Sequence, residues 1–271
     1  MISVVTGASS GIGAEAAVLL AAQGHEVALV GRTPGKLRAV ADRVAAATGV
    51  RPATFEADYT SFDSVRALAE TLLDRYPHID VFVNNAGVMT TERRLTGDGH
   101  EMIMQVNHLS PFLLTYLLLE RLEESGARVV NTASQAAATG RLDPDDLDRS
   151  RRRWSAWLQY GDSKQANVLF TTELARRYSR ITPVSVHPGV LRTAFAAGTF
   201  YMWLICRVPG MSQDPREGGA VLAHVATHPD VAARRGGYFN RRKPGRLTRR
   251  MSDPELAAAL WTASLRATGL S

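Results

Sequence analysis

Residues 4–13 read VVTGASSGIG and lead directly into residues 14–22, a run rich in alanine and leucine. The β-branched start predicts a buried strand, and the second run has the high helix propensity of its residue types. Gly7, Gly11 and Gly13 have no side chain where the backbone must turn, approach a ligand and bring the helix close to the sheet. The pattern predicts a strand, a tight turn and a helix whose N-terminus binds phosphate. An ordinary turn in an α/β protein is the alternative.

The whole chain has the composition of a globular protein. It has 271 residues, 45% of them hydrophobic and 21% charged, which suits a single domain over residues 1–271 with a sizeable core. The one cysteine, Cys206, excludes an internal disulfide framework and favours a reducing compartment. No basic segment precedes the first strand, so we expect a cytoplasmic protein without a secretory signal.

The net charge of +6 raises the question of nucleic acid binding. The positive charge is mostly arginine, because lysine occurs only at positions 36, 164 and 243. Arginines cluster at residues 149–153 and 241–250 and are otherwise spread along the chain. We interpret both clusters as solvated surface and expect no nucleic acid partner.

Strand patterns alternate with helix patterns along the chain. The strands expected after the first cover residues 25–30, 53–57, 79–83, 127–134, 183–187 and 237–239, and the helices that follow the first cover residues 35–47, 62–76, 99–120, 165–177, 217–227 and 253–267. Such repeated βαβ units predict the α/β class: a single-domain Rossmann fold with a doubly wound parallel sheet of about seven strands flanked by helices.

The end of the second strand bears on the choice of cofactor. In dinucleotide folds an acidic residue at this point binds the 2′-hydroxyl of the adenosine ribose, whereas an arginine accommodates a 2′-phosphate. Here the acid is missing and Gly31-Arg32 stands in its place. We therefore favour NADP(H) over NAD(H), and the alternative is that Arg32 is an ordinary exposed loop residue.

Polar residues occur at two further points where an apolar pattern is expected. Residues 84–87, Asn-Asn-Ala-Gly, follow the fourth strand, and amides beside small residues at the carboxyl end of a strand suit a ligand crevice. Asn107 lies within an expected helix, and Pro111 removes the N–H that would bond to its carbonyl. This break suits a water or a polar network, and an exposed asparagine is the alternative.

Tyr160 and Lys164 are four residues apart at an expected helix start, so they lie on one helix face. A nearby ammonium stabilises a phenolate and lowers a pKa that otherwise sits near 10. Tyr160 is therefore a candidate proton donor or acceptor, with Ser134 beside it to hold a substrate oxygen. A chance spacing of tyrosine and lysine is the alternative.

Two loops are expected to form the walls of the substrate pocket, residues 140–158 and 194–211. The second contains Phe195, Phe200 and Trp203. We favour a cover over an apolar substrate, and a membrane-surface contact or simple core packing are the alternatives. The apolar run at 194–208 is shorter than the roughly 20 residues that span a bilayer.

Taken together and in order, these motifs resemble the classical short-chain dehydrogenase/reductase family over essentially the whole chain. Its glycine motif is matched by residues 6–13, its Asn-Asn-Ala-Gly element by 84–87 and its Pro-Gly turn by 188–189. The Val-Asn-His-Leu around Asn107, the long interval from Ser134 to Tyr160 and the Gly-Gly-Tyr-Phe at 236–239 resemble the retinol dehydrogenase and WW-domain oxidoreductase-like branch. That branch usually has Val-Ser-Ser where this chain has Thr132-Ala133-Ser134, but the last serine is retained. The N-terminal membrane anchor of that branch has no counterpart in this sequence, and we therefore expect a soluble protein.

The resemblance implies an NADP(H)-dependent oxidoreductase acting on a carbonyl or alcohol of a small, apolar substrate. Tyr160 would be the acid or base, Ser134 would orient the oxygen, Lys164 would hold the nicotinamide ribose and Asn107 would support a proton-relaying water. Asp58 would bind the adenine and Thr193 the carboxamide. The implied cofactor-binding residues are Gly7, Ser9, Ser10, Gly11, Ile12, Gly13, Arg32, Asp58, Tyr59, Asn85, Ala86, Gly87, Tyr160, Lys164, Pro188, Gly189, Val190 and Thr193, and no metal site is expected. A nucleotide-sensing module that regulates a partner is the alternative function, and a homo-oligomer is consistent with the family.

Overall fold

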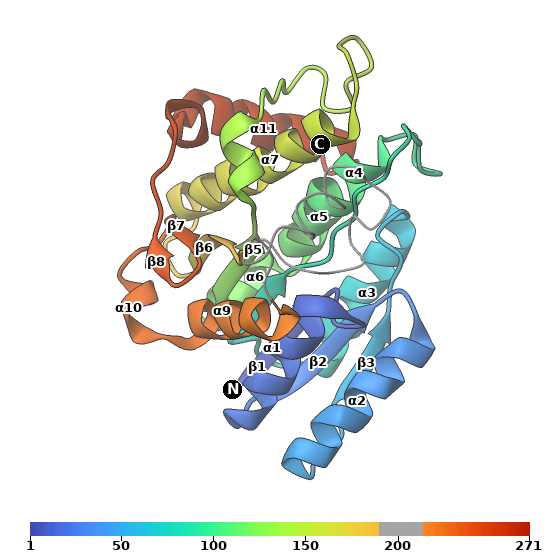
Figure 1. The fold of residues 1–271 in the computed structure, drawn as a ribbon, viewed down its shortest axis with the longest axis vertical. Coiled ribbons are helices and arrows are strands. Elements are labelled where there is room, and N and C mark those ends of the chain that lie inside the picture. The colour runs from blue at the N-terminus through green and yellow to red at the C-terminus, as the bar shows by residue number, and fades with distance from the viewer. Residues whose placement is uncertain (190–213) are drawn as a thin grey trace.

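The computed structural model describes residues 1–189 and 214–271. Its centre is a sheet of eight strands in the order β3-β2-β1-β4-β5-β6-β7-β8 (Figure 1). Neighbouring strands pair in parallel from β3 through β7, and β8 pairs antiparallel with β7. The strands are β1 (Ile2–Thr6), β2 (Glu26–Gly31), β3 (Ala53–Glu56), β4 (Val81–Asn84), β5 (Arg128–Thr132), β6 (Thr182–His187), β7 (Tyr238–Asn240) and β8 (Lys243–Pro244). The predicted doubly wound parallel sheet is confirmed. The added strand β8 has two residues, too few to form a readable pattern.

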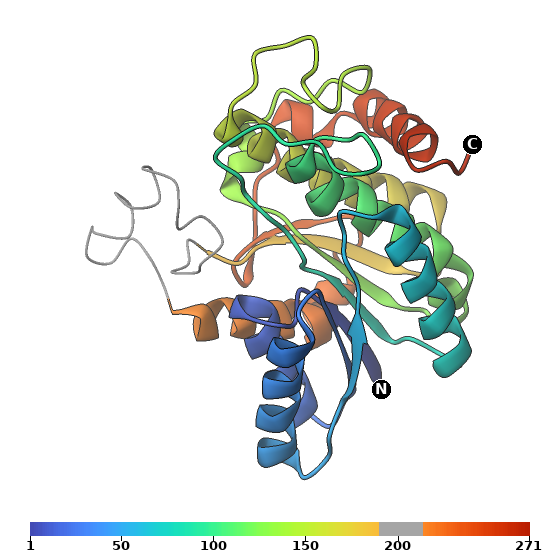
Figure 2. The ribbon, with the colours of Figure 1, turned by 90° about the vertical axis from the view of Figure 1, so that its right-hand side faces the viewer.

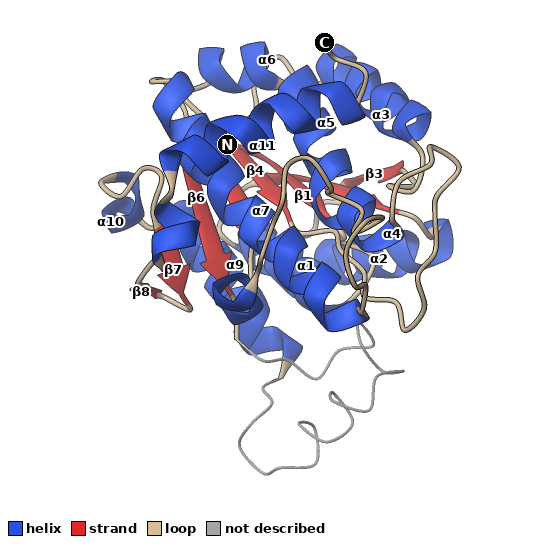
Figure 3. Cartoon of the chain, turned by 90° about the horizontal axis from the view of Figure 1, so that it is seen from above, coloured by secondary structure: helices blue, strands red, loops and turns tan. Residues whose placement is uncertain are grey.

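Helices cover both faces of this sheet (Figures 2 and 3). The longer ones are α1 (Gly11–Ala22), α2 (Pro34–Thr48), α3 (Phe62–Arg75), α5 (Ser110–Leu117), α7 (Ala156–Arg177), α9 (Pro215–Thr227) and α11 (Pro254–Ala267), and the shorter ones are α4 (Met102–Met104), η1 (Gln105–Leu109), α6 (Leu119–Glu124), η2 (Gln135–Thr139), α10 (Pro229–Ala232) and η4 (Arg249–Ser252). Among the described residues, no helix is both long and apolar enough to cross a membrane.

Alternate residues of the central strands supply the two halves of the core. Val5 and Val83 pack with α1, α2 and α9 on one face, whereas Val4 and Phe82 pack with α3, α5, α7 and α11 on the other. This follows from the two-residue period of a strand, because successive side chains point to opposite faces. Burial on both faces explains why these strands are continuous apolar runs.

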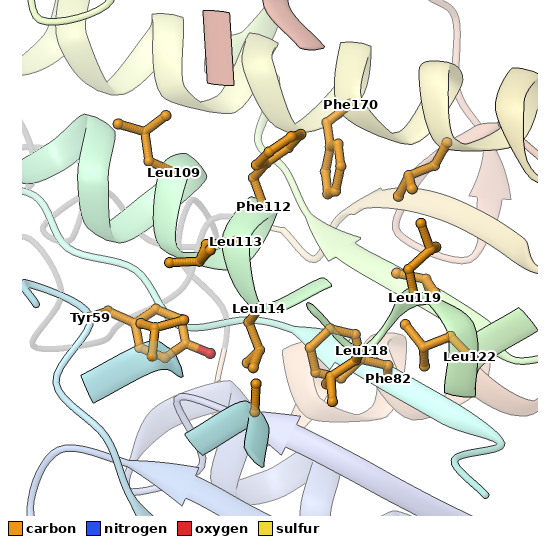
Figure 4. Packing of buried hydrophobic residues seen from close by; sticks show 14 of the residues in the cluster. Tyr59, Phe82, Leu109, Phe112, Leu113, Leu114, Leu118, Leu119, Leu122 and Phe170 are labelled. Carbon is orange, nitrogen blue, oxygen red and sulfur yellow. The ribbon is translucent and has the colours of Figure 1, made fainter. Parts of the chain in front are cut away.

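An aromatic cluster joins α5, α7 and α11 on the second face. The ring centroid of Phe112 lies 5.3 Å from that of Phe170 and 5.1 Å from that of Trp261, and Figure 4 shows Phe112 and Phe170 above the leucines of α5 and α6. Removal of a fully buried aromatic ring costs about 3–5 kcal/mol. The cluster therefore fixes α7, the helix that carries Tyr160 and Lys164, relative to the sheet.

Two expected helices differ from the structure. The single helix expected over 99–120 is divided into α4, the π-helical turn η1, and α5. Helix α7 begins at Ala156 instead of Gln165, with the Ser155 hydroxyl accepting a hydrogen bond from the Leu158 N–H at 3.3 Å. Tyr160 and Lys164 are consequently inside a helix rather than at its start.

Candidate active site

The glycine turn lies where β1 meets α1. Gly7 and Gly11 have φ angles of +65° and +59°, which favour glycine because a Cβ would be strained there. A Cβ on Gly13 would lie 2.5 Å from the Asn85 amide nitrogen and still closer to the Gly7 carbonyl oxygen. The absence of side chains therefore lets the helix start lie against both the β1 turn and the chain that leaves β4.

Thr6 joins the carboxyl ends of β1 and β4. Its hydroxyl accepts hydrogen bonds from the N–H groups of Asn85 at 2.9 Å and Ala86 at 3.1 Å, and donates one to the Val83 carbonyl at 3.2 Å. The Asn85 amide also donates to the Thr6 carbonyl at 3.0 Å. Because the helical connections diverge on either side of β1, this is the switch point at which open α/β sheets bind ligands.

The N-terminus of α1 is suited to an anion. Ser10 occupies the N-cap position without a side-chain hydrogen bond to the helix, and the first turn, which includes Ile12, has no acidic residue. The helix start therefore presents unpaired N–H groups and its positive dipole end. Ser9 is partly exposed and Ser10 is exposed. Together with the small turn, these residues fit a dinucleotide pyrophosphate.

Arg32 lies on the surface directly after β2. Among the described residues, it makes no ion pair. Asp58 follows β3, is half-buried, and accepts two hydrogen bonds of 2.9 Å from Thr60 through one carboxylate oxygen. Tyr59 has its side chain in the core, as Figure 4 shows, and its carbonyl accepts from the Ser110 hydroxyl at 2.7 Å. Arg32 and Asp58 thus line the edge expected to hold adenosine, whereas the Tyr59 side chain packs inward.

Asn107 lies in the π-helical turn η1 and is fully buried. Its amide oxygen accepts from the Val88 N–H at 2.7 Å, and its amide nitrogen donates to the Val88 carbonyl at 3.0 Å and the Ser163 hydroxyl at 3.1 Å. The exposed-asparagine alternative is therefore wrong. Asn107 connects the chain after Gly87 to the residue next to Lys164.

Ser134, Tyr160 and Lys164 lie together at the carboxyl end of β5. A hydrogen bond between the hydroxyls of Ser134 and Tyr160 acts on the phenol pKa. The Lys164 ammonium lies over the Tyr160 ring, 5.6 Å from its centroid, and donates to the Thr132 carbonyl at 3.1 Å. The spacing of Tyr160 and Lys164 is therefore not a coincidence without structural meaning, because the two side chains meet beside Ser134.

The expected lowering of the Tyr160 pKa is wrong for this structure. Desolvation by the surrounding protein raises the pKa of Tyr160 to about 12, and the hydrogen bond from Ser134 offsets only part of that rise. The Lys164 ammonium, 5.6 Å from the ring centroid, does not reverse this rise. Burial also lowers the pKa of Lys164 to about 8, so this group gains and loses its proton near neutral pH.

A buried polar network continues behind Lys164, and sequence reasoning missed it. The Asn167 amide donates to the same Thr132 carbonyl at 3.1 Å, and its oxygen lies 3.3 Å from Nδ1 of His108. Nε2 of His108 lies 2.9 Å from the Ser264 hydroxyl of α11. Burial lowers the pKa of His108 to about 4, so the ring is neutral at physiological pH. The sequence features that could have indicated this network are His108, next to Asn107, and Asn167, about one helical turn after Lys164.

Ion pairs with buried carboxylates fix the loop expected over residues 140–158. Arg149 donates to Asp162 at 2.8 Å, and the two side chains are 6% and 0% exposed. Arg152 pairs with Asp146 at 2.9 Å. The interpretation of cluster 149–153 as solvated surface is therefore wrong for these two arginines, because buried carboxylates on the loop and on α7 require positive partners.

The remaining predicted residues either follow β6 or lie outside the described residues. Pro188 and Gly189 follow β6, and Gly189 has a φ angle of +110°. Val190, Thr193 and the proposed cover at 194–211 lie outside the described residues. In the two described parts of the chain, no group of three His, Cys, Asp or Glu side chains could hold a metal ion.

Comparison with known proteins gives a consistent result. The family model for short chain dehydrogenase matches residues 1–201. The chain is 44% identical over 265 residues to the protein provisionally named daunorubicin C-13 ketoreductase DnrU of Streptomyces sp. (strain C5), covering 98% of this chain and 91% of that protein. It is 36% identical over 272 residues to human retinol dehydrogenase 11, covering 98% and 85%.

A solved structure from Shigella flexneri 2a str. 301, complexed with NADP, superposes with a TM-score of 0.72. Its sequence is 29% identical, and the match covers 89% of this chain and 96% of that one. The similarity therefore extends over nearly the whole length of each protein compared.

Proposed function

The chain belongs to the short-chain dehydrogenase/reductase family, in the branch that contains the retinol dehydrogenases, and from that premise we propose an NADP(H)-dependent oxidoreductase that interconverts a carbonyl and an alcohol. The observation that carries the proposal is the meeting of Ser134, Tyr160 and Lys164 at the end of β5. These three side chains can orient a carbonyl oxygen and transfer a proton to it.

The cofactor would be held by residues from several strand ends. The glycine turn and the N-terminus of α1 fit its pyrophosphate, and the missing Cβ of Gly13 lets that helix start lie against the turn and Asn85. Arg32, which has no ion pair with any described residue, supplies a guanidinium for a 2′-phosphate, and Asn85, Ala86 and Gly87 border the crevice beside Thr6. NADPH, when bound, supplies the hydride, and the protein supplies position and electrostatics.

Tyr160 would serve as the proton donor in the reductive direction. Because its pKa is raised to about 12, the phenol keeps its proton throughout the physiological range. The Ser134 hydroxyl, already bonded to the phenol, can hold the substrate oxygen in the same place. Lys164, with its pKa lowered to about 8, would return a proton to Tyr160 after each turnover. Asn107 and Ser163 fix the helix segment on which both residues lie.

The names of the relatives favour a small-molecule carbonyl or alcohol as substrate. One is named as a ketoreductase and another as a retinol dehydrogenase, and both names describe this pair of functional groups. The apolar character expected of the substrate depends on residues 194–211, which are not described. The cytoplasm is the proposed location, and subcellular fractionation tests it.

Replacement of Tyr160 with Phe tests the proposal. The ring and its packing remain, but the proton donor is lost, so NADPH-dependent reduction of a ketone substrate should fall by about 10²–10⁴-fold. Binding of NADPH, measured by its fluorescence, should be retained. Undiminished turnover would contradict the assignment of Tyr160. Tight NADPH binding without reduction of any member of a broad carbonyl panel would instead favour the nucleotide-sensing module.

A further inference from the structure

A cavity of about 1300 Å³ opens beside the proposed catalytic serine. It is lined by residues of η2, α9 and the β7–β8 hairpin, and Figure 3 shows α9 beside β7 and β8 at one edge of the sheet. Gln135, the residue after Ser134, is part of its wall. A molecule whose carbonyl reached Tyr160 could therefore extend into this cavity.

The described lining of the cavity is strongly positive. Five cationic side chains line it against the single carboxylate of Glu217, and they are Arg216, Arg241, Arg242, Lys243 and Arg246. All five are exposed and none forms an ion pair with a described residue. Elsewhere in the protein, Arg149, Arg152 and Arg176 each have a carboxylate partner. The cavity thus concentrates positive charge that is not paired with a carboxylate of residues 1–189 or 214–271.

The backbone of Arg241 is strained, so the position of this charged residue has a cost in conformational free energy. Asn240 pairs with Lys243, so Arg241 and Arg242 form a two-residue hairpin turn. Arg241 has a φ angle of +57°, at a turn position where glycine is usual. Its N–H donates to the His187 carbonyl at 2.8 Å, which ties the turn to the end of β6. Strained residues of this kind are found preferentially at functional sites.

The four cations of the β7–β8 hairpin and the residues after it are too far from the expected phosphates of the cofactor to serve them, whereas Arg216 starts α9, which packs on α1. The turn after β1 and Arg32 after β2 lie on the other side of β4, β5 and β6 in the sheet order. At about 4.8 Å per strand, β7 is about 19 Å from β1 and about 24 Å from β2. The anion that the cavity suits must therefore belong to another molecule.

The rest of the lining is largely apolar, with Ala138, Val221, Tyr238 and Met251 among its residues. An apolar wall with arginines around it suits a hydrocarbon body that ends in an anion, since guanidinium groups bind carboxylate or phosphate through paired hydrogen bonds. We propose that the carbonyl substrate carries such an anionic group, a carboxylate or a phosphate monoester, which the cations of the β7–β8 hairpin bind. This inference rests on the proposed function.

Matched ketones test the inference. With NADPH, the protein is assayed on 5-oxohexanoate, 7-oxooctanoate, 9-oxodecanoate and 11-oxododecanoate and on the amide of each. We expect kcat/KM to be about 10-fold or more higher for the acid than for its amide at the chain length that reaches the cations. The preference should shrink as salt is added, because exposed charges are screened. The ω-phosphate ester of the same ketone distinguishes phosphate from carboxylate.

Arg241→Gly is the decisive variant, because glycine removes the guanidinium and also suits the positive φ angle. It should keep or raise the thermal midpoint, reduce neutral ketones at the original rate and lose most of the acid preference. Arg180→Gln, an exposed arginine at the opposite end of β6, is the control and should change neither. Equal kcat/KM for acids and amides at every length would overturn the inference while leaving the proposed function intact. Reduction of neither kind of ketone would contradict both.

Discussion

Lys164 and Asn167 donate hydrogen bonds to one and the same acceptor, the carbonyl oxygen of Thr132, each at 3.1 Å. That carbonyl ends β5, two residues before Ser134. The shared acceptor fixes one turn of α7 against the strand that carries the serine. The position of the Lys164 ammonium is therefore tied to a peptide group two residues from Ser134.

Asn167→Ala should reduce turnover through the position of Lys164 rather than through lost chemistry. The change leaves His108 without its partner at Nδ1 and leaves Lys164 alone on the carbonyl. We expect the free energy of unfolding to fall by about 1–3 kcal/mol, kcat to fall several-fold and its pH profile to shift. Urea unfolding and kcat measured against pH check this. Thr172→Ala removes a hydrogen bond within the same helix and should leave the pH profile unchanged.

Gly13→Ala should abolish NADPH binding and destabilise the protein. The new methyl group would overlap the Gly7 carbonyl and the Asn85 amide, and overpacking of this kind costs about 1–3 kcal/mol. Gly35→Ala is the matched control, because nothing lies within 4 Å of a Cβ there and the helical backbone accepts alanine. The control should raise the free energy of unfolding by about 0.4–1 kcal/mol. Equal NADPH affinities in the two variants would contradict the assigned role of the turn.

Arg32→Ala should change the preference between the two nicotinamide cofactors. The guanidinium follows β2 without a carboxylate partner among the described residues, so its main proposed contact is the 2′-phosphate. Loss of a charge-assisted pair should weaken NADPH binding by about 10-fold or more and leave NADH binding nearly unchanged. Fluorescence titration with both cofactors measures the ratio. Equal affinity of the unmodified protein for NADPH and NADH would reject NADP(H) as its preferred cofactor.

Glu101→Gln should stabilise the protein at alkaline pH and have little effect in acid. Glu101 is fully buried, and desolvation raises the pKa of its carboxyl to about 7. A folded-state pKa above the unfolded value means that the folded state binds more protons, so stability is present below about pH 4.5 and is lost as pH rises through 7. Glutamine can still accept from the Met104 N–H, which is 3.0 Å away.

The expected gain for this variant is about 1–3 kcal/mol at pH 8. Denaturant midpoints measured at pH 5 and pH 8 check it. A gain that is the same at both pH values would show that the carboxyl does not titrate between them.

The sequence was sufficient for the features that depend on residue type at close spacing. Gly7, Gly11 and Gly13 could be placed because their backbone requirements are local. Tyr160 and Lys164 could be paired because helical periodicity alone puts them on one face. The alternation of apolar strands and helices was enough to predict repeated βαβ units and a parallel sheet.

Features that depend on distant partners could not be predicted in this way. The helix expected from Gln165 begins at Ala156 and includes Gly161, where a Cβ would lie 3.2 Å from the Ala136 carbonyl, so this glycine allows η2 to approach the helix. Arg149 and Asp162 form a buried pair only because the loop folds back on α7. The raised pKa of Tyr160 likewise reflects desolvation by surrounding protein, which a linear pattern does not contain.

The hydrogen bonds of Thr6 have a consequence for redesign of the enzyme. Because one hydroxyl satisfies the first two N–H groups beyond β4, the turn after β1 cannot be transplanted or remodelled unless residues 84–88 are exchanged with it. Arg32 has no comparable side-chain bond to the part of the chain that the structure describes. Substitutions after β2 alone should therefore be able to change the cofactor preference. The turn after β1, by contrast, can be exchanged only together with residues 84–88.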